Sequence, residues 1–110
     1  MSQHSVVEHV EFELLPGVSE SDFLAASEEI SRWTACQPGF EYRCLTRGED
    51  GRWLDLVFWS NEDHARRAGR RIMEEKGRSP FMRMIDDASV RIAHRPVMGR
   101  KAPAGLLLTA

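Results

Sequence analysis

The side chains of this sequence that could carry acid–base chemistry lie on strand-like segments, among aromatic residues. His9 and Glu11 alternate with apolar residues in one segment, and Asp55 lies between Trp53 and Trp59 in another. Histidine titrates near neutral pH and can act as a general base. A carboxylate among aromatic side chains can have a raised pKa and take the same role. His9 and Asp55 are therefore the candidate catalytic residues.

Each candidate also has a purely structural interpretation. Asp55 could form an ion pair with Arg43 or Arg91, and this interpretation is favoured over a base. His9 could be a histidine with a purely structural role in the interior of the protein. Tyr42 could hydrogen-bond an anionic, phenolate-type substrate or lie at a dimer interface. The residue types alone leave these alternatives open.

Other kinds of site find little support. A two-histidine, one-carboxylate metal site lacks its second imidazole, because His94 faces away from His9 and Glu11. Cys36 and Cys44 fit no metal or redox spacing and are expected to be free thiols in the cytoplasm. No glycine-rich phosphate loop is present. We therefore expect no metal and no cofactor.

The length, net charge and apolar content of the sequence limit the classes of binding partner. The length of 110 residues predicts one domain, and a net charge of −2 argues against nucleic-acid binding. The longest apolar runs, such as residues 106–108, are too short to span a bilayer. The first residues resemble no secretory signal. A small molecule or another protein chain is the remaining class of partner.

Periodicity and capping signals predict the elements that must position these residues. Segments 6–15, 40–47, 52–59 and 88–96 alternate as strands. Two helices follow the N-cap residues Ser19 and Asn61; the first ends near Ala35 and the second before Gly77. The type of segment 81–85 is open, with a helical turn as one option.

This order of elements, βαββαβ, is that of the ferredoxin-like α+β fold, with two helices on one face of a four-stranded antiparallel sheet. Residues 1–97 form this domain, and residues 98–110 form a C-terminal tail. RNA-recognition modules share the architecture. Residues 53–59, however, lack the flanking glycines and basic residues of such modules. An RNA partner is therefore disfavoured.

The hairpin around residues 48–51 determines which strand residues share a face. With an even number of loop residues, the leucines of residues 45, 54 and 56 lie with Phe58 beneath the helices, although a one-residue slip inverts this assignment. The opposite face then holds the polar and aromatic set. Its members are His9, Glu11, Tyr42, Trp53, Asp55, Val57, Trp59 and Arg91. Exposed aromatics in such a patch usually mark a partner or ligand.

Three motifs carry a family resemblance. They are Gln-Pro-Gly-Phe ending at Phe40, Glu-Asp-Gly-Arg-Trp in the hairpin, and Phe-Trp-Ser-Asn-Glu-Asp-His-Ala beginning at Phe58. Over residues 5–97 the chain resembles the antibiotic biosynthesis monooxygenase family and the wider dimeric α+β-barrel superfamily. The resemblance implies a homodimer whose two sheets pack face to face into a barrel. It also implies a pocket in each monomer, between sheet and helices or on the barrel side.

The resemblance also implies roles for residues. Trp59 matches a tryptophan that lines the active site of the oxygenase members, where it would stack on a flat substrate. The haem-degrading members carry a histidine ligand on the distal part of the second helix. This chain has no histidine there, so haem degradation is disfavoured and no cofactor is expected.

Two functions remain. The first is a cofactor-independent monooxygenase-like protein for an aromatic or polyketide-type substrate. His9 or Asp55 would take the proton, and Tyr42, Trp59, Glu11 and Arg91 would bind the substrate. The second is a non-catalytic, dimeric ligand-binding or stress-response protein. In that case the same residues fill the barrel.

Overall fold

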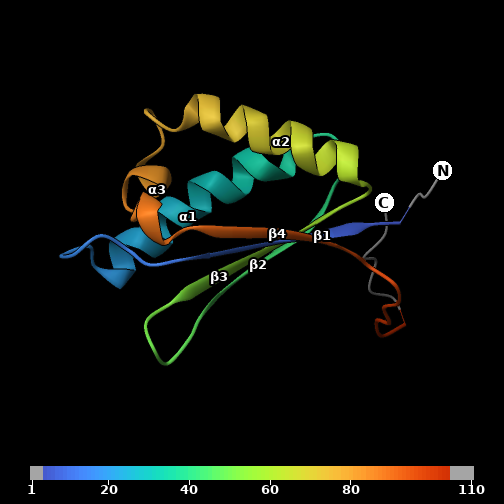
Figure 1. Ribbon diagram of the computed structural model, residues 1–110, viewed down its shortest axis with the longest axis horizontal. Coiled ribbons are helices and arrows are strands. Elements are labelled where there is room, and N and C mark those ends of the chain that lie inside the picture. Colours follow the sequence, from blue (N-terminus) through green and yellow to red (C-terminus); the bar gives the residue numbers. More distant parts are fainter. Residues whose placement is uncertain (1–3, 105–110) are drawn as a thin grey trace.

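Four strands and three α-helices alternate along residues 4–104, the part of the chain that the computed structural model describes (Figure 1). Leu106 to Leu108, the apolar end of the tail, lie outside these residues. The elements are β1 (Val6–Phe12), α1 (Glu20–Ala35), β2 (Phe40–Arg47), β3 (Trp53–Trp59), α2 (Glu62–Glu75), α3 (Pro80–Arg83), the 3₁₀ turn η1 (Asp87–Ser89) and β4 (Arg91–Pro96).

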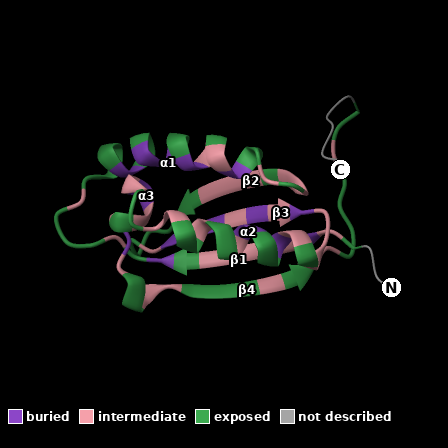
Figure 2. Cartoon of the chain, turned by 90° about the horizontal axis from the view of Figure 1, so that it is seen from above, coloured by how far each residue is buried: buried purple, intermediate pink, exposed green. Residues whose placement is uncertain are grey.

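The strands form one antiparallel sheet in the order β2-β3-β1-β4. All three α-helices cover the same face of this sheet and leave the opposite face open (Figures 1 and 2). The predicted ferredoxin-like α+β fold is confirmed. Segment 81–85, left open by the sequence, contributes the short helix α3. Within the described residues no helix is long and apolar enough to cross a membrane.

The helices begin where the capping residues predict. The Ser19 hydroxyl accepts a hydrogen bond from the Asp22 N–H, and the Asn61 side chain accepts one from the His64 N–H. Each cap satisfies one of the unpaired amides of a first turn. Gly39 then brings β2 close to α2. Its φ is +83°, and a Cβ placed there would clash with the His64 side chain, so only glycine fits at this crossing.

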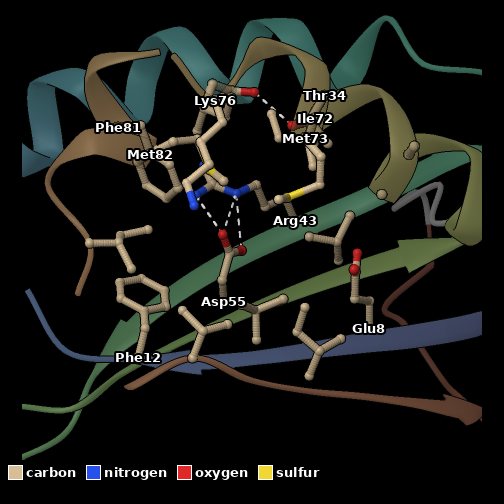
Figure 3. Close-up of a pocket in the computed structure, with 18 of the residues that line it drawn as sticks. Glu8, Phe12, Thr34, Arg43, Asp55, Ile72, Met73, Lys76, Phe81 and Met82 are labelled. Carbon is tan, nitrogen blue, oxygen red and sulfur yellow. Dashed lines mark hydrogen bonds and ion pairs between the residues drawn. The ribbon is translucent and has the colours of Figure 1, made fainter. Parts of the chain in front are cut away.

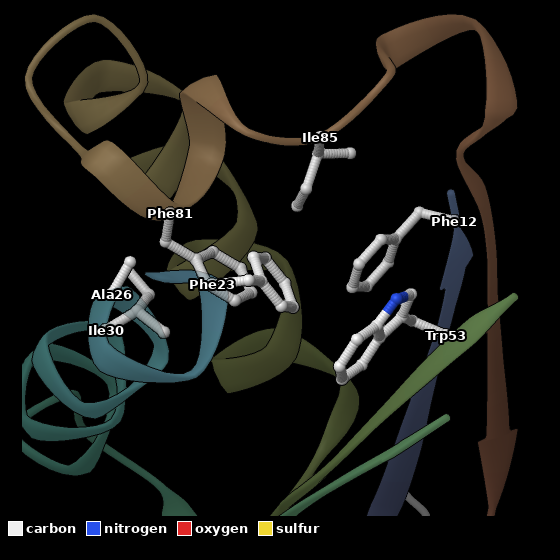
Figure 4. Close-up of a cluster of buried hydrophobic side chains, with 7 residues drawn as sticks. All are labelled: Phe12, Phe23, Ala26, Ile30, Trp53, Phe81 and Ile85. Carbon is white, nitrogen blue, oxygen red and sulfur yellow. The ribbon is translucent and has the colours of Figure 1, made fainter. Parts of the chain in front are cut away.

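The core beneath the helices has two parts. An aromatic group joins Phe12, Phe23, Trp53 and Phe81, with Phe23 stacked on Phe81 at 4.8 Å and edge-on to Trp53 at 4.9 Å (Figure 4). Trp59, 2% exposed, centres a second group beneath α2. Both groups use the tryptophans of β3, so this strand is the centre of the covered face.

The predicted facing of β2 is correct, whereas that of β3 is wrong. Arg47 pairs with Trp53, which leaves five residues, 48–52, in the loop, and Gly51 supplies a φ of +83° within it. An odd loop shifts β3 by one residue relative to the prediction and therefore exchanges its faces. The covered face holds Trp53, Asp55, Val57 and Trp59, together with Arg43 and Leu45; the open face holds Leu54, Leu56 and Phe58, together with Tyr42 and Cys44.

The faces of β1 and β4 agree with the prediction. Val6, Val10 and Phe12 point toward the helices, whereas His9 and Glu11 lie on the open face. By the same register His94 lies on the covered side, opposite Glu8, and Arg91 pairs with Glu11 on the open face. Side chains alternate between the two faces without interruption in these strands, so every second residue lies on the same face, as predicted.

The tail begins by packing on the edge of the sheet. Arg100 forms an ion pair with Glu41 at 3.1 Å and donates a hydrogen bond to the Ser5 hydroxyl at 3.0 Å. Glu41 lies in the register shift between Phe40 and Tyr42 and its side chain is almost fully buried. The tail therefore covers an irregularity of β2 as far as Arg100.

Candidate functional site

A cavity of about 380 Å³ lies between the covered face of the sheet and the helices (Figure 3). Its walls come from all four strands on one side and from α1, α2 and α3 on the other. Most of the lining is apolar and includes Val10, Phe12, Ile30, Trp33, Val57, Trp59, Ile72, Phe81 and Ile85. Cavities of a few hundred Å³ with such walls and a few polar groups bind small organic molecules.

The cavity opens beside α2 and β4. Met73 and Ile92 line it and are 58% and 61% exposed, so they lie at its rim. Lys76 and Asp87, also in the lining, form an ion pair at 2.6 Å that joins the end of α2 to η1. A ligand would therefore enter past two apolar side chains and one solvent-accessible ion pair.

A buried ion pair forms the polar floor of the cavity. Arg43 on β2 donates to both carboxylate oxygens of Asp55 on β3, with the shortest contact from Nη2 to Oδ2 at 2.8 Å (Figure 3). Its Nη1 donates to the hydroxyls of Ser27 and Ser31 on α1. Burial raises the pKa of Asp55, and the hydrogen bonds and charge of Arg43 offset part of that rise.

The ion-pair interpretation of Asp55 is confirmed, with Arg43 as its partner. The two side chains are only 7% and 11% exposed. The guanidinium also lies 5.4 Å from the centre of the Phe81 ring, a distance that permits a cation–π contact. Arg43 engages both carboxylate oxygens of Asp55, so Asp55 would have to give up this pairing to accept a proton, although burial raises its pKa. A catalytic role for Asp55 stays a prediction.

A second carboxylate in the cavity wall was not among the predicted site residues. Glu8 on β1 accepts a hydrogen bond from the indole N–H of Trp59 at 3.2 Å. Its other oxygen, Oε2, lies 3.6 Å from Nε2 of His94 on β4. Burial raises the pKa of Glu8, and the Trp59 and His94 contacts offset part of the rise. Glu8 interrupts the apolar alternation of β1, and that interruption was the signal for it.

The chain of contacts continues to the surface. Nδ1 of His94 lies 3.0 Å from Oε2 of Glu62, the first residue of α2. The hydrogen bond with His94 is the main reason that the pKa of Glu62 is lowered from its usual value. Glu62 also pairs with Arg66 at 2.9 Å. The imidazole thus lies between one carboxylate in the cavity wall and one at the surface.

The structure divides the predicted site residues between the two faces of the sheet. Asp55 and Trp59 line the cavity. His9, Glu11, Tyr42 and Arg91 lie on the open face; Glu11 pairs in register with Arg91, and the ring of Tyr42 lies 5.9 Å from that of Phe58. The six residues therefore do not share one face of the sheet, as the inverted facing of β3 had implied, and their functional roles stay predictions.

Comparison with known proteins gives no match to a protein-family profile and none to a curated protein. Solved structures do match. A protein from Bordetella bronchiseptica, described as belonging to the antibiotic biosynthesis monooxygenases, aligns over 87% of this chain and 99% of its own, with a TM-score of 0.70 and 18% identity.

Two Streptomyces structures match as well. SnoaB of Streptomyces nogalater, a cofactor-independent oxygenase, covers 92% of this chain and 98% of its own, with a TM-score of 0.60 and 20% identity. A Streptomyces coelicolor monooxygenase, solved in complex with nanaomycin D, covers 93% of this chain and 95% of its own, with a TM-score of 0.66 and 17% identity. The chain has the ferredoxin-like α+β fold of the antibiotic biosynthesis monooxygenase structures.

Proposed function

We propose that this protein is a small, cofactor-independent monooxygenase whose flat aromatic or polyketide-type substrate binds in the cavity beneath the helices. The observation that carries the proposal is an apolar cavity of about 380 Å³ with Trp59 and the Glu8 carboxylate in its wall. An apolar chamber admits both a ring system and O₂, and a carboxylate without an arginine partner can accept a proton. The shared fold of the Streptomyces oxygenases supports the same reaction class.

The reaction that fits this chamber begins with loss of a proton from an activated methylene of the substrate. The electron pair stays on the substrate as an enolate, which reacts directly with O₂. One oxygen atom becomes the new carbonyl oxygen and the other leaves as water, so the methylene supplies all the electrons and no external reductant is needed. The protein's tasks are to hold the ring, take the proton and exclude bulk water.

Trp59 is the residue that we propose to hold the ring. It is 2% exposed, and its N–H is already bonded to Glu8. These contacts fix the ring in the cavity wall, and we propose that the flat substrate packs against this part of the wall. Arg43, fixed by Asp55 and Ser27, supplies a positive charge at the floor of the cavity and would favour an enolate or phenolate oxygen.

Oxygen uptake with an anthrone tests the proposal. We expect protein-dependent O₂ consumption, with one anthraquinone formed per O₂, that a chelator leaves unchanged. Gly69→Phe provides the structural test. Gly69 lines the cavity, and a Cβ there meets no atom within 4 Å, so a ring would occupy space that the substrate needs. Arg70→Phe, at the adjacent exposed position, is the matched control.

The outcomes separate the alternatives. Loss of uptake in Gly69→Phe and retention in Arg70→Phe support catalysis in the cavity. Anthrone binding without oxygen uptake would instead favour the non-catalytic ligand-binding protein. Equal uptake in both variants would place the reaction outside the cavity, and a catalytic role of His9 on the open face would then become the leading alternative.

We also propose that the open face of the sheet binds a second copy of the chain. Its centre is apolar, with Leu54, Leu56 and Phe58 on β3, and Tyr42 beside them is 44% exposed. Two such sheets packed face to face would bury these side chains. Sedimentation should show a dimer at micromolar concentration; a stable monomer would refute the proposal.

We also propose that the protein is cytoplasmic, on the basis of its two free thiols. Cys36 and Cys44 are both unpaired in the structure, as expected in a reducing compartment.

A further inference from the structure

Glu8, His94 and Glu62 form a row that runs from the cavity to the surface. Their side chains become steadily more accessible along it, at 14%, 20% and 41% exposed. Glu8 lines the cavity, whereas His94 and Glu62 line a hollow on the outer surface, which Arg66 also borders. The row thus connects the apolar cavity with a separate part of the surface through ionisable groups.

The row has the geometry of a proton path. The two ring nitrogens of His94 face different carboxylates, Nε2 toward Glu8 at 3.6 Å and Nδ1 toward Glu62 at 3.0 Å. The three side chains therefore do not converge on one point. Among residues 4–104 no three histidine, cysteine, aspartate or glutamate side chains are placed so that they could hold one metal ion. An imidazole can accept a proton on one nitrogen while it releases another from the second.

We propose that Glu8 is the proton acceptor of the cavity and that His94 and Glu62 carry the proton from it to solvent. This inference rests on the proposed function, because it assigns the base for a substrate bound in the same cavity. Neither predicted base competes well for this task. Asp55 is committed to Arg43 by paired hydrogen bonds, and His9 lies on the other face of the sheet.

The step involves proton transfer only. A carbon–hydrogen bond of the substrate methylene breaks, an O–H bond forms on Glu8, and the electron pair stays on the substrate as its enolate. Glu8 then passes the proton to Nε2 of His94, while Nδ1–H passes its own proton to Glu62, which releases it to water. The 3.6 Å gap between Glu8 and His94 must shorten to hydrogen-bond length for the transfer. Such contacts commonly tighten only when substrate is bound.

The directions in which the pKa values of the two carboxylates are shifted fit the assignment. Burial raises the pKa of Glu8, so its carboxylate has a greater proton affinity than a solvated glutamate. The pKa of Glu62 is lowered, so it releases a proton to water readily at neutral pH. Trp59 donates to Oε1 of Glu8 and leaves Oε2 for proton exchange.

Hydrogen–deuterium exchange isolates the proton step from the reaction with oxygen. Anthrone is incubated with the protein in D₂O under argon, and NMR follows loss of its methylene proton signal against a protein-free control. We expect Glu8→Gln to reduce the protein-dependent exchange rate by about 100-fold or more, the usual contribution of a general base. Glutamine keeps the size of the side chain and can still accept the Trp59 hydrogen bond.

The relay has a separate signature. Without His94, Glu8 returns the same proton to the substrate more often, so His94→Ala should slow exchange, and added imidazole should restore it. Glu62→Gln should slow exchange as well. Glu74→Gln, a change at an exposed residue of the same helix, is the matched control and should leave exchange unchanged. Rescue by imidazole is not expected for a residue that only supports the fold.

Each result decides one of the two proposals. Exchange without O₂ uptake would support Glu8 as the acceptor and overturn the monooxygenase. Exchange that is equal in Glu8→Gln and in the unaltered protein, or no exchange above the protein-free control, would overturn Glu8 as the acceptor. Normal exchange in His94→Ala with no response to imidazole would overturn the relay.

Discussion

Removing one partner of the Arg43–Asp55 pair should destabilise the protein strongly. Asp55→Asn leaves the Arg43 guanidinium, 7% exposed, without a counter-charge in the floor of the cavity. Its contacts with Ser27 and Ser31 remain, but neutral hydroxyls do not replace a carboxylate. Breaking a buried pair in this way costs about 3–5 kcal/mol. That is a large share of the roughly 5–15 kcal/mol that stabilises a typical domain.

The assay is urea denaturation followed by tryptophan fluorescence. Arg47, on the same strand as Arg43, provides a matched control. It forms an ion pair with Glu20 of α1 at 2.8 Å, but the two side chains are 49% and 54% exposed. Arg47→Met should therefore cost less than about 1 kcal/mol. The double variant Arg43→Met/Asp55→Leu should recover most of the stability, since it leaves no buried charge. Similar losses for Asp55→Asn and Arg47→Met would refute the reasoning.

Three further predictions concern the cavity and the open face. Gly69→Ala should raise the free energy of unfolding by about 0.5–1 kcal/mol, because a helical glycine gains a side chain and the Cβ meets no neighbour; a loss of stability would show that the site is already filled. Burial raises the pKa of Glu8, so the folded state binds a proton more tightly than the unfolded state, and stability is lost as pH rises from the ordinary glutamate pKa through the folded one. Glu8→Gln should remove this loss, so its stability relative to the unaltered protein should increase between pH 4 and pH 7 in denaturation measurements, and an unchanged difference would contradict the raised pKa. Phe58→Asp should convert a dimer to a monomer in sedimentation without loss of helical circular dichroism, whereas an intact dimer would exclude Phe58 from the interface.

The elements of the fold could be predicted because their signals are local. Ser19 and Asn61 cap the helices that follow them, and the alternation in β1 places His9 and Val10 on opposite faces as expected. Such signals depend on the few residues around each element. The order of elements then led to the ferredoxin-like fold.

The facing of β3 could not be predicted, because it depends on one residue of loop length. An Asp-Gly turn fits hairpin loops of several lengths, and the even count chosen for it placed Asp55 and Trp59 on the open face. In the structure the odd loop directs both toward the helices. In this register both tryptophans of β3 are buried beneath the helices, a long-range packing outcome that no local pattern reveals.

Glu8 could not be assigned to the site from the sequence, because its partners are distant along the chain. Glu8 contacts Trp59 and His94, which follow it in the chain by 51 and 86 positions. No local sequence pattern reveals contacts over such separations. The signal was the charged residue between Val6 and Val10 on an otherwise apolar face. A carboxylate at such a position costs free energy unless it has partners, so its presence on that face indicates a polar contact beneath the helices.

The central claim is that ligands bind in the cavity beneath the helices and not on the open face of the sheet. NMR titration with anthrone under argon tests it most directly, because the two faces carry different reporters. The claim predicts that the indole N–H signal of Trp59 shifts while the ring signals of Tyr42 stay in place. Shifts of Tyr42 with an unchanged Trp59 signal would contradict it.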